Sequence, residues 1–415
     1  MVYKKNGVDI DLINMSTLEQ AVKKHEDWRE HCLNMNAAES VIFDKSSEKF
    51  LISDLSRRAV LGRPGKRYSE GGKYIDEIEE ITDQVACDLF NSKFSEWRPM
   101  SASVADGVLI HALTNIGENI IATPSPMGHP TWHEDGYAGF RGLNITNLPF
   151  DWNTLDIDYD KLETLISSSN FSLAIHGSSL ILFPPDFKRL VKVLDNIPLW
   201  YDGAHVMGLI AAGIFPNPLN SGALVLSGST QKTLSGPLGG LIVSNDQKIM
   251  DKVNLCASND TATPDYGRIA SLAANMIKWK IHGKKFSEAV VTNARSLGEE
   301  LNNIGIKVLL ENRGYTSTHQ LAIVAPEGLD AVSAATKLSS ANIITTPFPF
   351  PDGNGGIVEA IRLGTTEITN KGMNVNDMFK VAKTIKMGFE DVETAKRMIQ
   401  EILYPDGNDS VHNFL

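Results

Sequence analysis

The sequence predicts an α/β protein with a large domain built on a mostly parallel β-sheet and a smaller α+β domain at the C-terminal end. From about residue 92 to 245, short apolar runs alternate with stretches of helical periodicity. Within these runs polar and apolar residues do not alternate, which is typical of strands buried on both faces of a parallel sheet. After a long helical stretch over 267–303, shorter apolar runs return together with further helical patterns, and this change predicts the second domain.

The N-terminal part is predicted to hold two helices separated by an arm. Ser16 and Glu19 have the spacing of a capping box, and they predict the start of an amphipathic helix that extends towards Cys32. The stretch 46–74 is rich in Arg, Gly and Pro, and we expect a long arm there rather than regular structure. A second helix is predicted over roughly 75–92.

Six apolar runs are the predicted strands of the large sheet: NIIAT, NITNLPF, SLAIHG, PLWYD, ALVLSG and GGLIVS. In the C-terminal part the predicted strands are KVLL, QLAIVAP, NIITT and IVEAIRL, with helices over 329–339 and 376–402. We therefore expect an N-terminal helix and arm over 1–74, a large domain over 75–282 and a small domain over 283–415.

Composition and charge restrict the class of protein. The 415 residues are 42% hydrophobic and 21% charged, which is ordinary for a soluble globular chain. No apolar run reaches the roughly 18–20 residues that span a bilayer, and the N-terminus lacks the apolar core of a secretory signal, so no membrane partner is expected. A net charge of −11 argues against a nucleic-acid partner. Three widely spaced cysteines predict neither disulfides nor a metal site, and they suit a reducing cytoplasm.

Two segments carry the clearest chemical signal, YDGAH over 201–205 and SGSTQKT over 227–233. Asp202 closes an apolar run and is therefore expected at the carboxyl end of a strand, where open α/β sheets bind ligands. A carboxylate, His205 and Lys232 on neighbouring strand ends suit pyridoxal 5'-phosphate. The amine can form an imine with this cofactor, and the carboxylate keeps the pyridine nitrogen protonated. From spacing alone, ordinary polar residues at strand ends remain the alternative.

Short motifs elsewhere in the chain follow an order that is typical of one enzyme family. They are NAAES over 36–40, PGKRY over 64–68, SAS over 101–103, GH at 128–129, DGAHVMGLIAAGIF from Asp202, STQKTLSGPLGG from Ser229 and AIRLGT over 360–365. Together they resemble the serine hydroxymethyltransferases, which are fold-type-I pyridoxal-phosphate enzymes. The resemblance extends from about Leu33 to Met373, and it implies a seven-stranded type of sheet flanked by helices.

The resemblance also implies roles for individual residues. Lys232 is expected to bind pyridoxal phosphate covalently, Asp202 to hold the pyridine nitrogen and His129 to stack on the ring. His205 is expected near the phenolic oxygen of the cofactor, and Arg362 is expected to bind the substrate carboxylate. Lys232 and His129 are also candidate proton carriers. The other residues assigned to the cofactor are Ser101, Ala102, Ser103, Ser179, Ser229, Gln231 and Thr263, and those assigned to the substrate are Glu39, Tyr68 and Glu70.

Elementary chemistry supports two of these assignments. The serines of SAS precede a helix-like run, VADGVLIHAL, and a helix N-terminus offers free N–H groups to a phosphate; a simple capping serine is the alternative. The planar guanidinium of Arg362 can hold a carboxylate by two parallel hydrogen bonds; a solvated surface arginine is the alternative. His129 and His133 have the spacing of a metal pair, but Pro130 interrupts the helix and no third ligand follows, so no metal is predicted.

The chain departs from the family on the substrate side. Leu61 stands where the family has a glutamate that acts on the hydroxymethyl group and folate, and Glu70 is a candidate for partial compensation. Ala38 replaces a serine that helps hold the substrate carboxylate, and Gln231 replaces the histidine before the lysine.

Two loops also differ. The glycine-rich phosphate loop of the partner subunit is replaced by NDTATP over 259–264, and the loop that contacts folate reads TPFPFP over 346–351. The sequence therefore favours a folate-independent aldol-type cleavage or formation of a Cα–Cβ bond in a β-hydroxy α-amino acid, as in a threonine-type aldolase or transaldolase. The alternatives are transamination, decarboxylation, β-elimination or racemisation of a small or modified amino acid, and folate-dependent hydroxymethyl transfer.

The expected partners are a small amino acid, an aldehyde and a second copy of the chain. Fold-type-I enzymes commonly build each site from two chains, so the resemblance implies a homodimer with shared active sites. The segments 46–74 and 258–264 are those expected to cross over. A non-enzymatic binding protein on the same fold is the other class considered, and it would be expected to lose Lys232 or Asp202, both of which are present.

Overall fold

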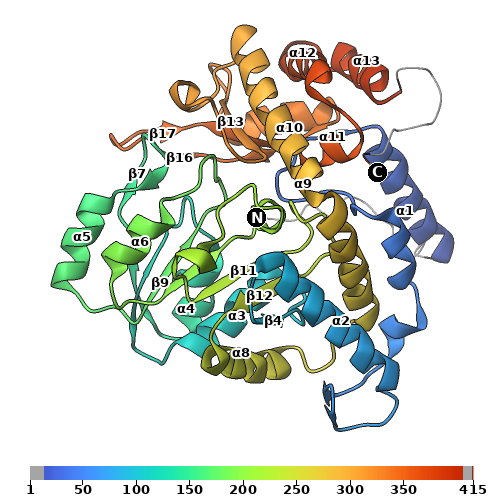
Figure 1. Ribbon diagram of the computed structural model, residues 1–415. Coiled ribbons are helices and arrows are strands. Elements are labelled where there is room, and N and C mark those ends of the chain that lie inside the picture. Colours follow the sequence, from blue (N-terminus) through green and yellow to red (C-terminus); the bar gives the residue numbers. More distant parts are fainter. Residues whose placement is uncertain (1–13, 405–413, 415) are drawn as a thin grey trace.

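The computed structural model describes residues 14–404 and residue 414. A seven-stranded sheet forms the centre of its larger part (Figure 1). In spatial order the strands are β4 (Phe94–Glu96), β12 (Gly240–Ser244), β11 (Val225–Ser229), β10 (Leu199–Asp202), β9 (Leu173–Gly177), β5 (Asn119–Ala122) and β6 (Asn144–Asn147). From β11 to β6 all neighbours are parallel, and only β12 runs against its two neighbours. The predicted α/β class and mostly parallel sheet are confirmed.

Helices cover both faces of this sheet, which explains the unbroken apolar strands. Every residue of β9, β10, β11 and β12 is buried. Tyr201 packs in the cluster that contains α2 (Lys73–Phe90), α7 (Met207–Ala211) and part of α9 (Tyr266–Asn303), whereas its neighbour Trp200 packs with α3 (Ala102–Leu113) and α8 (Gln247–Asp260). Adjacent residues of a strand point to opposite faces. The two sets of helices therefore lie on opposite sides of the sheet.

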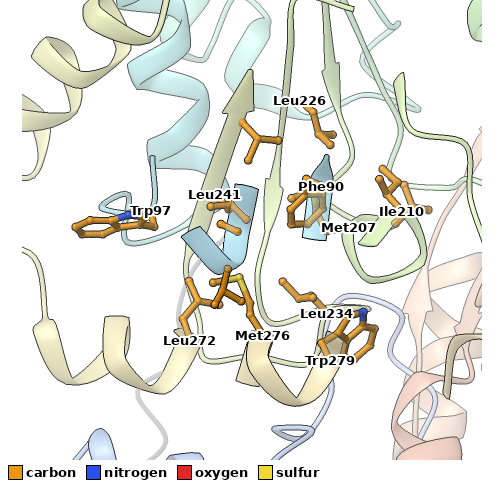
Figure 2. Packing of buried hydrophobic residues seen from close by; sticks show 14 of the residues in the cluster. Phe90, Trp97, Met207, Ile210, Leu226, Leu234, Leu241, Leu272, Met276 and Trp279 are labelled. Atoms are coloured by element: carbon orange, nitrogen blue, oxygen red, sulfur yellow. The ribbon is translucent and has the colours of Figure 1, made fainter. Parts of the chain in front are cut away.

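The long helix α9 forms much of the core on the first face. Figure 2 shows Leu272, Met276 and Trp279 of α9 turned towards Leu234 and Leu241. Further along, α9 contributes to a second hydrophobic cluster together with helices of the C-terminal part. It spans the predicted domain boundary at 282 and ties the two parts of the molecule together.

The C-terminal part is built on a small antiparallel sheet. Its strand order is β13 (Gln320–Val324), β18 (Ala360–Gly364), β15 (Thr346–Pro347). Helices pack around it: α10 (Ala331–Ser340), α11 (Thr366–Asn370), α12 (Met378–Glu390) and α13 (Val392–Leu403). Short pairs complete it, β1 (Leu33–Asn34) with β14 (Ile343–Ile344) and β16 (Phe350–Pro351) with β17 (Ile357–Val358). The remaining elements are α1 (Met15–Glu30), α4 (Tyr137–Phe140), α5 (Tyr159–Ser168), α6 (Phe187–Leu194), β7 (Phe150–Asp151) and β8 (Asp156–Ile157).

The N-terminal predictions need correction. Helix α1 is capped by Asn14, because this residue has the extended backbone of a cap and its side chain accepts from Thr17 N at 3.0 Å. Ser16 lies inside the helix. The predicted arm is partly regular, with 3₁₀ helices over Lys45–Phe50 and Asp54–Arg57 and a hairpin of β2 (Gly62–Arg63) and β3 (Lys66–Arg67). Gly65, at φ +70°, permits the hairpin turn.

Two C-terminal predictions were also wrong in detail. The run KVLL forms no strand and contributes a single bridge, Val308 to Ile323. The helix predicted over 376–402 is divided into α12 and α13 at Asp391, because its extended backbone ends one helix while its carboxylate caps the next. Within the described part of the chain, no helix is long and apolar enough to cross a membrane.

Candidate active site

Lys232 and Asp202 lie at the carboxyl ends of two neighbouring strands of the central sheet. Asp202 is the last residue of β10, and Lys232 follows β11, the parallel neighbour of β10. Asp202 is buried and Lys232 is partly buried, and each shifts the pKa of the other. The Asp202 Oδ1 accepts from Ala204 N at 2.8 Å, which leaves its second oxygen without a hydrogen bond among the described residues. We call Lys232, Asp202, His205, Gln320 and Arg362 the Lys232 cluster.

A chain of hydrogen bonds fixes the proton of His205. Gln320 Oε1 accepts from the backbone N–H of Ile181 at 2.5 Å, so the amide nitrogen of Gln320 must be the group that faces His205 Nδ1 at 3.0 Å. His205 Nδ1 is therefore an acceptor, and the neutral ring carries its proton on Nε2. That Nε2 lies 3.2 Å from Lys232 Nζ. The contact is best made when the lysine is a neutral amine that accepts from His205.

Burial brings the pKa of this amine closer to neutrality. Desolvation lowers the pKa of Lys232 from 10.5 to about 8, with Asp202 opposing the shift and Arg362 adding to it. Burial likewise raises the pKa of Asp202 to about 6, against the attraction of Lys232. Desolvation keeps the pKa of His205 well below its usual range. At neutral pH the cluster thus combines an ionised carboxylate with an amine that readily gives and takes a proton.

Arg362 reaches the same cluster from β18 of the small sheet. Its Nη1 donates to the Ser179 carbonyl oxygen and lies 3.5 Å from His205 Nε2. The guanidinium carbon stands 5.3 Å from the ring centre of Phe348. Its Nε is buried and has no partner among the described residues. Burial lowers its pKa to about 10, so it remains charged at neutral pH, and an anion placed beside it would satisfy it.

The N-terminus of α3 is a candidate phosphate-binding site. The hydroxyl of Ser101 caps the helix by accepting from Val104 N at 3.2 Å, while the backbone N–H groups of Ala102 and Ser103 make no hydrogen bond among the described residues. Gly240 of β12 lies against this turn, and a Cβ there would come within 2.4 Å of the Ser101 carbonyl oxygen. Free N–H groups at a helix start bind phosphate well. The residues present therefore fit pyridoxal phosphate.

His129 lies beside a further buried carboxyl group. Its Nδ1 is 2.9 Å from Thr131 Oγ1, and that oxygen is 2.7 Å from Asp106 Oδ2. Desolvation lowers the pKa of His129 to about 4, with Lys232 contributing in the same direction. The imidazole is therefore neutral at neutral pH. Among the described residues no group of three or more His, Cys, Asp or Glu could hold a metal ion.

Other predicted residues take different positions. Ser179 contributes its carbonyl oxygen to Arg362 and Gln320, rather than its hydroxyl. Ser229 is buried at the end of β11, and Gln231 keeps its side-chain oxygen buried without a partner among the described residues. Glu39 is bound to Arg29 at 2.9 Å and to Asn34 at 3.1 Å.

Three predicted residues are not brought to the Lys232 cluster within one chain. Tyr68, Glu70 and Thr263 are exposed, and Tyr68 retains 87% of its accessible surface. All three belong to the arm or to the loop between α8 and α9. Their assignment to a site shared with a second copy stays a prediction.

Gln320, Asp106 and His319 were missed by the sequence reasoning. His319 stacks on His205 with ring centres 6.0 Å apart, and burial lowers its pKa to about 3. Gln320 opens the apolar run QLAIVAP, and a polar residue at the start of a buried strand was the available signal. Asp106 was visible as an acidic residue in the apolar helix run VADGVLIHAL, where a lone carboxylate is costly to bury.

Replacing Gln320 with leucine is expected to lower the free energy of unfolding by ~2–4 kcal/mol, since Ile181 N and His205 Nδ1 would be left buried without partners. Thermal unfolding followed by circular dichroism measures the effect. The exposed Gln84, whose side chain bonds only Asp88 among the described residues, provides the matched control, and Gln84→Leu should leave the midpoint nearly unchanged. Equal midpoints for the two variants would contradict the positioning role.

Comparisons with known proteins identify relatives of the whole chain. The serine hydroxymethyltransferase family model matches residues 13–385. A serine hydroxymethyltransferase from Methanopyrus kandleri is 34% identical over 413 residues, covering 96% of each chain. An alpha-methylserine aldolase from Variovorax paradoxus is 35% identical over 363 residues, covering 86% of this chain and 82% of the relative.

The same architecture is present in a solved structure. The crystal structure of L-threonine transaldolase from Pseudomonas fluorescens in its internal aldimine state matches with a TM-score of 0.85 and 23% identity, over 93% of this chain and 91% of that one. At this level of identity the likeness shows the fold, and it confirms the predicted fold-type-I architecture. The predicted class, a pyridoxal-phosphate-dependent transferase or lyase of aldol type, is confirmed by the sequence relatives. Because the family match and these relatives extend along nearly the whole chain, the protein belongs to the serine hydroxymethyltransferase family.

Proposed function

We propose that this protein cleaves or forms the Cα–Cβ bond of a β-hydroxy α-amino acid without folate, and that a serine bearing an alkyl group on Cα is among its substrates. The observation that carries the proposal is the aromatic surround of Arg362. The loop that the resemblance assigns to folate holds Phe348 against the guanidinium, and Phe350 lies buried in the cluster beside it. An apolar surround favours an alkyl substituent beside the carboxylate that Arg362 binds.

The arm supports a folate-independent reaction. Leu61 stands where the resemblance expects an acid–base glutamate, and Glu70 makes no hydrogen bond or ion pair among the described residues. Glu70 is therefore not held in place by other groups of the same chain to act on a folate-bound carbon. The likeness to an alpha-methylserine aldolase agrees with this interpretation.

We assign separate roles to the residues of the Lys232 cluster and to the N-terminus of α3. Bound pyridoxal phosphate supplies a conjugated ring that accepts the electrons of the breaking bond. Lys232 would hold it covalently, Asp202 would keep its ring nitrogen protonated, and the N-terminus of α3 would bind its phosphate. Arg362 would bind the substrate carboxylate and so fix the orientation of the substrate. As a free amine, Lys232 would be able to move a proton, because its pKa of about 8 lies near neutrality.

Folate-dependent hydroxymethyl transfer is the second candidate. It is favoured by the similarity to the serine hydroxymethyltransferase from Methanopyrus kandleri, which aligns over 96% of this chain. Transamination, decarboxylation, β-elimination and racemisation use the same cofactor residues and differ only on the substrate side.

Released aldehyde separates these candidates. The holoenzyme is incubated with serine, α-methylserine and threonine, each with and without tetrahydrofolate, and the aldehyde and keto-acid products are measured. We expect aldehyde from at least one β-hydroxy amino acid without folate, with a rate that folate does not raise. Aldehyde or methylene transfer only in the presence of folate would establish the second candidate instead. A keto acid without aldehyde would establish another reaction type.

We further propose a homodimer in the cytoplasm. The exposed Tyr68 and Thr263 are the residues that a second copy would bring to the site. The family membership supports the homodimer, and the three free cysteines suit a reducing compartment.

A further inference from the structure

Asp106 is a buried carboxyl group that has no assigned role in the proposed reaction. It lies on α3 and is 1% exposed. Its Oδ1 has no partner among the described residues, and its Oδ2 lies 2.7 Å from Thr131 Oγ1 and 3.8 Å from His129 Nδ1. The charged groups that act on it are Asp202 and Lys232. Asp106 therefore interacts electrostatically with Asp202 and Lys232 of the Lys232 cluster, and it also lies close to His129.

The hydrogen atoms available between Asp106 and His129 can be counted. The backbone N–H of Thr131 points at His129 Nδ1 at 3.3 Å, so Nδ1 must be an acceptor and the neutral ring carries its proton on Nε2. The Thr131 hydroxyl also lies 2.9 Å from Nδ1, and it can make that contact only by donating its single hydrogen there. It then has no hydrogen left for Asp106. The 2.7 Å contact is a hydrogen bond only if Asp106 is the donor.

We propose that Asp106, Thr131 and His129 form a directed hydrogen-bond relay, in which a neutral Asp106 carboxyl group donates to Thr131 and Thr131 donates to His129 Nδ1. Asp106 is thereby a positioning residue, which fixes the tautomer and the ring orientation of His129. This inference deepens the proposed function, because His129 is the side chain expected against the cofactor ring.

The surroundings of Asp106 keep its carboxyl group neutral. Burial raises its pKa well above the usual value, and repulsion from Asp202 raises it further, while Thr131 and Lys232 act in the opposite direction without cancelling the shift. An ionised Asp106 would require the opposite relay, with Thr131 donating to the carboxylate and His129 Nδ1–H facing the backbone N–H of Thr131. Two N–H groups directed at each other repel, so the neutral arrangement is favoured.

The relay decides what His129 offers to a bound molecule. With Nδ1 occupied and the proton on Nε2, the exposed side of the ring presents an N–H donor and no lone pair. His129 therefore holds an acceptor atom of the cofactor or substrate in place, and it does not remove a proton. Proton abstraction then falls to Lys232.

Two spectroscopic signals test the relay in the holoenzyme. The tautomer of His129 is determined from two-bond ¹H–¹⁵N spectra of histidine-labelled protein, with the signal assigned by its loss in His129→Phe. The neutral carboxyl group is detected as an infrared band that is lost in Asp106→Asn. We expect the Nε2–H tautomer and such a band at neutral pH.

Matched variants of Thr131 test the coupling between Asp106 and His129. Thr131→Val removes the hydroxyl at nearly constant shape, and it should shift both the Nδ1 resonance of His129 and the carboxyl band of Asp106. Thr131→Ser keeps the hydroxyl and should restore both signals. A purely structural role for Thr131 would not move both signals together and recover them in this way.

An Nδ1–H tautomer in the wild-type protein, the absence of a carboxyl band that depends on Asp106, or unchanged signals in Thr131→Val would each overturn the relay. Neither signal requires turnover. An enzyme that releases no aldehyde but shows both signals would refute the proposed function and leave the relay intact.

Discussion

Replacing Lys232 with alanine is expected to abolish covalent attachment of pyridoxal phosphate and to lower turnover by about 10⁴-fold. The variant would lose both the amine proposed to bind the cofactor and the group proposed to move the proton, and each such contribution is large in enzymes. The buried Asp202 would also lose the charge that Lys232 supplies. The visible absorbance of the holoenzyme and the rate of aldehyde release are the two measurements.

A lysine away from the site controls for the loss of a positive charge. Lys248 is exposed on α8, and Lys248→Ala should keep both the visible band and the activity. An unchanged visible band in Lys232→Ala would refute the assignment of this residue as the attachment point.

Replacing Arg362 with alanine is expected to raise KM for the amino acid and to lower kcat/KM by about 10²- to 10³-fold, because truncating one partner of a buried, hydrogen-bonded charge pair costs about 2–5 kcal/mol. Arg362→Lys should recover only part of this loss. An ammonium group cannot offer two parallel hydrogen bonds to a carboxylate, and it would not reproduce the contact of the guanidinium with the Phe348 ring. Steady-state kinetics with the best substrate measures the effect.

Arg397 on α13 provides the matched control, since it is exposed and lies on the outer helix of the C-terminal part. Arg397→Ala should leave KM unchanged. Wild-type KM in Arg362→Ala would reject the carboxylate-binding role. A visible absorbance that survives in Arg362→Ala while KM rises would separate substrate binding from cofactor binding.

The elements that could be predicted well are those whose structure is determined by residues close together in the sequence. The fully buried strands β9 to β12 appear as continuous apolar runs, and Asp202 ends its run because the strand stops at the sheet edge. The errors arose where local signals compete. Asn14 and Ser16 are both good helix caps, and only the backbone conformation at Asn14 selects between them.

The short motifs around Lys232, Asp202 and Arg362 could be recognised in the chain itself, because the residues that recognise a cofactor lie next to the glycines and strand ends that position them. The direction of the hydrogen bonds among these residues could not be predicted from the sequence. Gln320 lies 115 positions from His205, and Asp106 lies 25 positions from Thr131. Neither spacing has a pattern that predicts contact. Packing of the small sheet against the large one, and of α3 against the segment after His129, brings these groups together in a dry interior. There each hydrogen atom must have an acceptor, and this requirement determines which nitrogen of His205 and of His129 carries the proton.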